Sequence, residues 1–164
     1  MRDIWKELTE WTENSKAFAI ARVIHTWRSA PRASGAGMIV GENMEIAGSV
    51  SGGCIEGAVI EEALEVLKDG KPRKLHYGVE DELALSVGLS CGGEVSVLVE
   101  KHWAFSDNEQ TRDVWKLLHD ALKKNEPAVL LSKTTNPSST PMLILPESKD
   151  YGDWGEANRL AKKA

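Results

Sequence analysis

Two cysteines lie in short motifs of opposite order, SGGC at 51–54 and SCGG at 90–93. A cysteine thiolate is a nucleophile and a soft ligand for metals. Cys54 precedes a helical pattern, where the positive end of the helix dipole would favour the thiolate. The same position also suits a small buried hydrophobe that packs the helix start. Cys91 stands beside two glycines that leave its backbone accessible, so we expect Cys91 to be the soft ligand or sulfur acceptor.

The two glycines before Cys54 suit an anion-binding turn. We expect a helix over 54–68 with Gly53 as its N-cap, Cys54 as its first residue and Glu56 as its third. Free N–H groups and the helix dipole would then face an anion such as phosphate, and Gly52 and Gly53 would let it approach closely. The stretch matches neither G-x-G-x-x-G nor G-K-[ST]. A plain strand–turn–helix connection is therefore the alternative.

Glu56 falls inside the apolar face of this expected helix, near Ala63 and Leu67. A carboxylate in such a place must find hydrogen-bond donors. Glu56 could be the N3 half of a capping box that reaches back to its own helix start. It could equally contact a ligand, such as a polar heterocycle. The residues alone leave both interpretations open.

The segment from Asn14 to Gly41 contains no Asp or Glu, although the net charge of the chain is −5. Its basic residues are Lys16, Arg22, Arg28 and Arg32. This pattern predicts a local positive zone, which His25 could join. Arg28 and Arg32 flank Ser29 and Pro31 in a loop, and arginine pairs with phosphate through two parallel hydrogen bonds. Ordinary solvated arginines are the alternative.

Hydrophobic periodicity and turn residues predict the elements that would position these residues. We expect helices over 3–13, 54–68, 80–88 and 155–164, and one that begins at a Ser106–Glu109 capping box and ends before Pro127. We expect strands over 17–27, 38–40, 45–50, 73–77, 94–100, 128–132 and 142–145. The sequence therefore predicts an α/β fold, with a single domain over 1–164 and a mixed sheet flanked by helices.

The two ends of the chain resemble each other. DIWKEL at 3–8 matches DVWKLL at 113–118, an offset of 110, and the same offset aligns the strand at 18–21 with 128–131. After a deletion of six residues, 38–40 aligns with the strand near 142–145. The pattern indicates two copies of a helix–strand–loop–strand–helix unit, at 3–68 and 113–164. Chance similarity between two amphipathic units is the alternative.

Composition excludes several classes of protein. The acidic net charge disfavours a nucleic-acid partner. No segment is apolar and long enough to cross a membrane, and no export signal is present, so we expect a cytoplasmic protein. Two cysteines fit neither a zinc motif nor, in a reducing compartment, a structural disulfide.

Three stretches together resemble the xanthine dehydrogenase accessory family, also called XdhC/CoxI. They are HTWRSAPRASGAGMIV (25–40), GSVSGGCIEGAVIEEALEVL (48–67) and GLSCGGEVSVLVE (88–100). The resemblance spans about 17–100. It implies a protein that binds the molybdenum cofactor, as molybdopterin or its nucleotide form, and supports its sulfuration. It also implies delivery to the apoenzyme of a molybdenum hydroxylase such as xanthine or carbon monoxide dehydrogenase. The resemblance further implies a chaperone rather than an enzyme, forming a homo-oligomer and working with a cysteine desulfurase.

Carried over by position, the resemblance marks the cofactor-binding residues as Ser29, Pro31, Arg32, Ser51, Gly52, Gly53, Cys54, Glu56, Cys91, Gly92 and Gly93. Cys91 would contact the molybdenum or its sulfur, and Arg28, Arg32 and the helix start would hold the phosphate. The family usually has Gly at position 28 and a basic residue at 37, where this chain has Arg28 and Gly37. The family's usual C-terminal Rossmann-type domain does not follow within the 164 residues, and we expect a separately encoded protein to supply it.

Two other functions fit the same residues. A thiol-dependent enzyme acting on a phosphorylated substrate would need Cys54 for turnover. A regulatory module that senses a nucleotide through its glycine-rich loop would need neither thiol.

Overall fold

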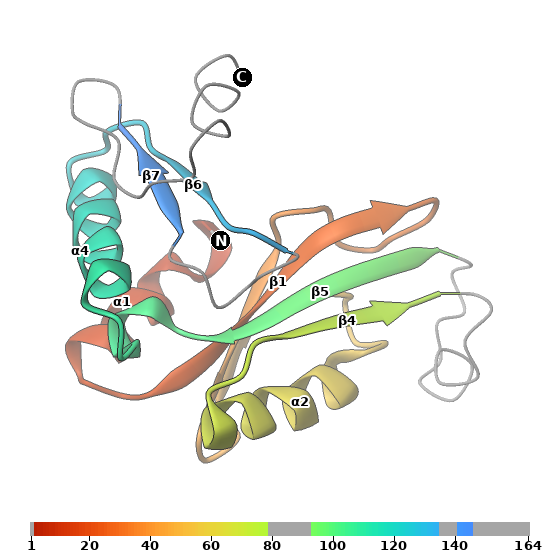
Figure 1. Ribbon diagram of the computed structural model, residues 1–164. Helices are drawn as coiled ribbons and strands as arrows, with labels where there is room; N and C mark the ends of the chain where they lie inside the picture. Colours follow the sequence, from red (N-terminus) through yellow and green to blue (C-terminus); the bar gives the residue numbers. More distant parts are fainter. Residues whose placement is uncertain (1, 79–92, 135–140, 146–164) are drawn as a thin grey trace. The chain divides into compact units, whose positions relative to one another are not determined.

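The computed structural model describes residues 2–78, 93–134 and 141–145 (Figure 1). The backbone divides into two compact units, Met1–His102 and Trp103–Ala164. Two expected helices, 80–88 and 155–164, lie outside the described residues. None of the described helices is long and apolar enough to span a membrane.

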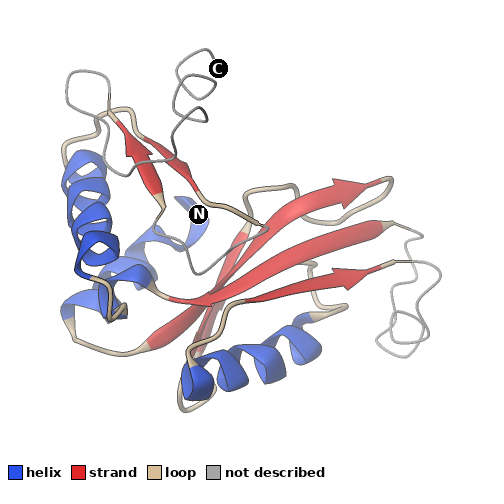
Figure 2. Ribbon diagram, in the orientation of Figure 1, coloured by secondary structure: helices blue, strands red, loops and turns tan. Residues whose placement is uncertain are grey.

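The first unit is a five-stranded sheet with helices beside it (Figure 2). In chain order its elements are η1 (Arg2–Ile4), α1 (Trp5–Glu13), β1 (Phe18–Trp27), β2 (Gly37–Gly41), β3 (Ile46–Gly48), α2 (Glu56–Asp69), β4 (Arg73–Tyr77) and β5 (Glu94–Lys101). The strand order is β3-β2-β1-β5-β4.

The predicted α/β class is confirmed, whereas the strand directions differ from the expected mixed sheet. All four ladders of the five-stranded sheet are antiparallel. The connections β1–β2 and β2–β3 are short, and short connections reverse the chain, whereas a parallel pair needs a longer crossover.

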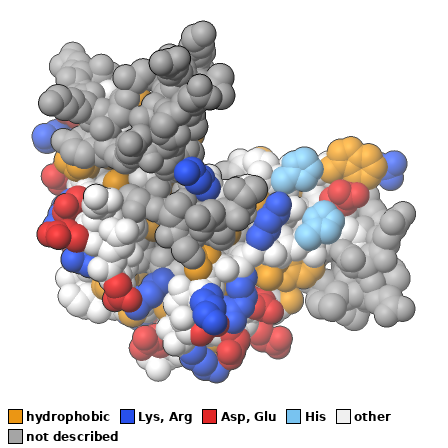
Figure 3. All heavy atoms as spheres, viewed as in Figure 1, with side chains coloured by type: hydrophobic (Ala, Val, Ile, Leu, Met, Phe, Trp, Pro, Cys, Tyr) orange, Lys and Arg blue, Asp and Glu red, His pale blue; other side chains and the backbone are white. Residues whose placement is uncertain are grey.

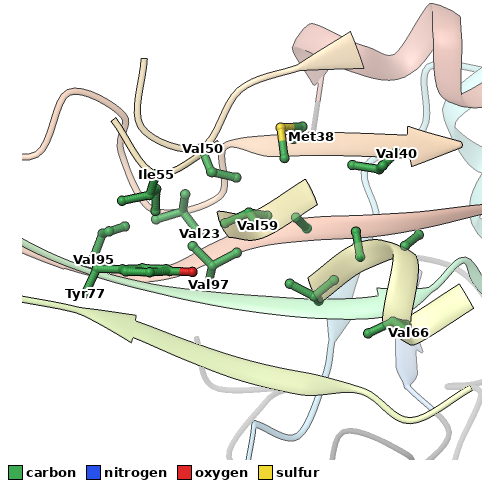
Figure 4. Close-up of a cluster of buried hydrophobic side chains, with 14 residues drawn as sticks. Val23, Met38, Val40, Val50, Ile55, Val59, Val66, Tyr77, Val95 and Val97 are labelled. Atoms are coloured by element: carbon green, nitrogen blue, oxygen red, sulfur yellow. The ribbon is translucent and has the colours of Figure 1, made fainter. Parts of the chain in front are cut away.

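Helix α2 covers one face of this sheet and forms the core of the unit (Figure 4). Val59, Ala63 and Val66 of α2 are fully buried against strand residues that include Val23 and Val97. This confirms the apolar face expected for the helix. Burying each valine removes its side chain from water at a gain of roughly 1.5 kcal/mol or more. This packing places the start of α2 near the last residues of β1 and the first residues of β5.

The second unit contains η2 (Trp103–Phe105), α4 (Glu109–Lys123), β6 (Val129–Leu131) and β7 (Met142–Ile144). The predicted Ser106–Glu109 capping box is wrong. Asn108 is the N-cap, and its side-chain oxygen accepts from the N–H groups of Gln110 (2.9 Å) and Thr111 (3.4 Å). Asn108 is an equally good cap and lies directly before the first helical residue, so it displaces the more distant Ser106.

The strand pairing of the two units agrees with the expected repeat, residue by residue. In the first unit the ladder pairs Ala19 with Val40 and Ala21 with Met38. An offset of 110 on the first strand and 104 on the second gives the pairs Val129–Ile144 and Leu131–Met142, which the second unit contains. Both hairpins are antiparallel, and a helix precedes each. A common origin of the units stays a prediction.

Candidate functional site

The turn before α2 is organised around the Glu56 carboxylate. This carboxylate accepts hydrogen bonds from the backbone N–H groups of four successive residues, Val50 (3.2 Å), Ser51 (2.8 Å), Gly52 (3.1 Å) and Gly53 (2.8 Å). The hydroxyls of Ser49 (2.6 Å) and Ser51 also donate to it. The Glu56 carboxylate therefore occupies the position where an external anion was expected. The N–H groups of the turn form a concave anion site, and this side chain of the same protein binds there.

Partial burial by itself would raise the pKa of Glu56. Hydrogen bonds from Ser49 and Ser51 outweigh that effect and lower the pKa to about 2. The side chain is therefore a carboxylate throughout the physiological range. Of the two interpretations that the sequence left open, the structure matches the contact that reaches back to the helix start.

The helix begins two residues later than expected. Ile55 is the N-cap and Glu56 the first helical residue, so Gly53 is not the N-cap and Cys54 is not in the helix. The reason is Ser51, whose hydroxyl oxygen accepts from the N–H groups of Cys54 and Ile55, both at 3.0 Å. These bonds hold Cys54 in the turn. The N–H groups expected to face phosphate between positions 50 and 55 are thus already bonded within the chain.

A small pocket lies beside this turn and joins three segments that are distant in the sequence. Its lining consists of Ser29, Ala30, Pro31, Val50, Ser51, Cys54, Gly93, Glu94 and Val95. Five of the expected site residues therefore meet at one place, namely Ser29, Pro31, Ser51, Cys54 and Gly93. The Cys54 thiol is free and partly exposed.

The pocket depends on close backbone contact at Gly93. A Cβ at this position would lie 2.4 Å from the carbonyl oxygen of Ser29 and 3.0 Å from that of Trp27. Across the pocket, a Cβ on Gly52 would lie 3.6 Å from Pro31. Gly52 and Gly53 have φ angles of 82° and 120°, which favour glycine. Gly92 and Cys91 lie outside the described residues.

The local positive zone expected over 14–41 is largely neutralised in the fold. Lys16 pairs with Glu45 at 2.7 Å, and the partly buried Arg22 pairs with Glu100. Acids that are distant along the chain supply these partners, so an acid-free stretch of sequence is not an acid-free surface.

Arg28 and Arg32, the two expected phosphate ligands, have different surroundings. Arg32 forms an ion pair with Asp3 of η1. The guanidinium of Arg28 instead lies 4.0 Å from the ring centroid of Trp27, which is a cation–π contact and not an ion pair. No sequence signal linked Asp3 with this loop, and Trp27 was not among the expected site residues.

The sequence profile of the XdhC and CoxI family matches residues 11–78, which include the Ser29–Arg32 loop and the Glu56 turn. Over these residues the chain is therefore similar to the XdhC and CoxI family. Two stretches within the matched residues, 29–31 and 50–54, thus line the pocket together with residues 93–95.

Known proteins resemble this chain over different lengths. The uncharacterized protein YqeB of Escherichia coli strain K12 is 37% identical over 100 residues, which are 61% of this chain and 18% of YqeB. PaoD of the same organism, a molybdenum cofactor insertion chaperone, is 33% identical over 61% of this chain and 31% of its own length. A probable xanthine dehydrogenase component of Bacillus subtilis strain 168 is 24% identical over 88% of this chain and 42% of its own.

A solved structure shares the fold. The crystal structure of a protein described as a xanthine dehydrogenase from Bacillus halodurans superposes with a TM-score of 0.72 at 29% identity, covering 92% of this chain and 45% of that one. The chain spans less than half of the length of each of these proteins.

Proposed function

We propose that this chain binds the molybdenum cofactor, supports its sulfuration, and passes it to the apoenzyme of a molybdenum hydroxylase. The observation that carries the proposal is the pocket in which Ser29, Ser51, Cys54 and Gly93 meet. The match of residues 11–78 to the XdhC and CoxI family and the similarity to PaoD, a molybdenum cofactor insertion chaperone, support it. The cofactor is the cargo of the protein, so its residues need to bind and release rather than turn over a substrate.

The roles of the residues follow from their chemistry. Cys91 precedes Gly93 by two positions and would offer a thiolate to the molybdenum or its sulfur. Cys54 lines the pocket and provides a second thiol. Glu56 holds the turn that carries Cys54 and does not contact the cargo. Arg28, rather than Arg32, would pair with the phosphate, because Asp3 already pairs with Arg32.

The partners belong to the proposal as well. A cysteine desulfurase would supply the sulfur, and a molybdenum hydroxylase would receive the loaded cofactor.

The experiment is a titration of the purified chain with molybdenum cofactor under exclusion of oxygen, read as protein-bound molybdenum. Cys91→Ala should weaken binding at least about tenfold, a loss of about 1.4 kcal/mol, because a thiolate ligand is removed. Ser90→Ala is the matched control and should bind as the unmodified chain does. Urea unfolding of each variant separates lost binding from lost folding. Unchanged affinity in Cys91→Ala would remove Cys91 from the site.

A further inference from the structure

A group of aromatic and polar side chains projects from one face of the sheet, at the end where β1 stops and β5 begins. The register pairs His25 with Ser96 and Trp27 with Glu94, and it pairs His76 of β4 with the same Ser96. Residues paired directly across an antiparallel ladder share a face of the sheet. Figure 3 shows histidine and acidic side chains, and a hydrophobic side chain beside a basic one, at the right-hand end of the view.

An irregularity in β1 places these side chains away from the core. The register shifts between Val23 and His25. Val23 and Val97 therefore pack under α2, whereas Trp27 projects from the opposite face with Glu94. Trp27 is 45% exposed, which is unusual for so large an apolar side chain at the end of a central strand.

Arg28 is held over the Trp27 ring by an uncommon backbone conformation. Its φ angle is 56°, in the left-handed region that non-glycine residues seldom adopt. Such a conformation costs on the order of 1–2 kcal/mol and is often found at binding sites. It brings the guanidinium 4.0 Å from the ring centroid, against the indole of a side chain that is partly exposed to solvent.

This pair adjoins the pocket of the candidate site. The Trp27 carbonyl oxygen lies 3.0 Å from the position of a Cβ on Gly93, and Ser29 and Glu94 line the pocket itself. Glu94 therefore belongs both to the pocket lining and to the face of the sheet that carries Trp27.

We propose that Trp27, Arg28 and Glu94 bind a phosphorylated aminopyrimidinone ring, of the guanine or pterin type. The flat ring stacks on the indole of Trp27. Its adjacent N–H donors face the Glu94 carboxylate, whose two oxygens accept hydrogen bonds. Its phosphate pairs with the Arg28 guanidinium. The inference rests on the proposed function and assigns one part of the cargo to these three residues.

The test is calorimetry of the full chain with GMP, AMP, guanosine and ribose 5-phosphate as probes. GMP should bind more tightly than AMP, because adenine lacks the adjacent pair of N–H donors that Glu94 would accept. Trp27→Ala should weaken GMP and guanosine alike, at least about tenfold, because one stacking contact is lost. Trp27→Phe keeps a flat ring and should retain most of the affinity.

Two further variants separate the remaining contacts. Arg28→Ala should lower the affinity for GMP to that for guanosine and leave guanosine unchanged. Glu94→Gln should remove the preference for GMP over AMP. Lys68→Ala, a charge removed from the exposed side of α2, is the control and should change nothing.

The inference is wrong if Trp27→Ala binds GMP as the unmodified chain does, if that chain does not distinguish GMP from AMP, or if GMP fails to bind at millimolar concentration. These results leave the proposed function standing when the molybdenum cofactor still binds. If the probes behave as expected and the molybdenum cofactor does not bind, the three residues form a nucleotide site and the proposed function fails.

Discussion

Glu56 shows how one side chain can take the place of a ligand. A glycine-rich turn before a helix offers N–H groups to an anion, and here the anion belongs to the chain. The turn is therefore complete before any cargo arrives. Its contribution to a binding site is a fixed position for Cys54 and Ser51, not free donors.

We predict that Glu56→Gln destabilises the protein by about 1–3 kcal/mol. An amide has one acceptor oxygen in place of two, and its NH2 group would face the N–H groups of the turn. Urea unfolding at neutral pH measures the difference. Glu61→Gln, on the exposed side of the same helix, is the matched control and should change stability by less than about 0.5 kcal/mol.

The stability of the unmodified protein and that of Glu56→Gln should respond differently to acid. The pKa of Glu56 is lowered from 4.5 to about 2 in the folded protein. The carboxylate of Glu56 therefore contributes its full stabilisation at pH values above the pKa of the unfolded chain, about 4.5. This contribution to the free energy of unfolding is lost as pH falls from about 4.5 toward 2. The difference in free energy of unfolding between the unmodified protein and Glu56→Gln should shrink over that range. A difference that stayed constant would contradict the hydrogen bonds described for Glu56.

At the scale of the elements, periodicity predicted the positions of the described helices and strands, and close contacts determined what it missed. The apolar face of α2 and the strand at 73–77 agree with the sequence because burial follows a regular period. The start of α2 moved because Ser51 and Glu56 satisfy the turn through side chains. Such local competition between capping groups is not visible in periodicity.

Gly93 links strand β5 to the loop after β1, and we predict that Gly93→Ala destabilises the protein by about 1–3 kcal/mol. The new methyl group would meet backbone atoms of Ser29, which cannot rotate away. The thermal midpoint should fall, and cofactor binding should weaken as the pocket wall shifts.

Gly57→Ala is the matched control for this substitution. Gly57 lies in α2 with open space around its Cβ position, so alanine should stabilise the helix by up to about 1 kcal/mol. Equal effects of the two substitutions would mean that Gly93 is not closely packed.

At the scale of the whole molecule, the sequence indicated which motifs would carry the site but not how charge is distributed in space. Ser29, Ser51, Cys54 and Gly93 meet as a common site requires. The positive zone expected from the sequence is largely neutralised in the folded protein. Asp3 pairs with Arg32 and Glu100 pairs with Arg22, although both acids are distant from these arginines in the sequence. Motifs are local and can be found in one sequence, whereas ion pairs depend on the complete fold.

The two hairpins have the same strand register but differ in the motifs that they carry. The second unit keeps the strand pairing of the first, while its sequence has no counterpart of Arg28, Arg32 or the Gly-Gly-Cys turn at the aligned positions. The candidate site accordingly lies wholly within the first unit.

The most direct test of the central claim, that the molybdenum cofactor occupies this pocket, is protection of the Cys54 thiol. The rate of alkylation of Cys54 by iodoacetamide is measured by mass spectrometry in a Cys91→Ser background, with saturation by cofactor verified through bound molybdenum. The account predicts that bound cofactor slows the alkylation of Cys54 at least about tenfold, because Cys54 lines the pocket. An unchanged rate with cofactor bound would contradict it, since the cargo would then occupy another part of the molecule.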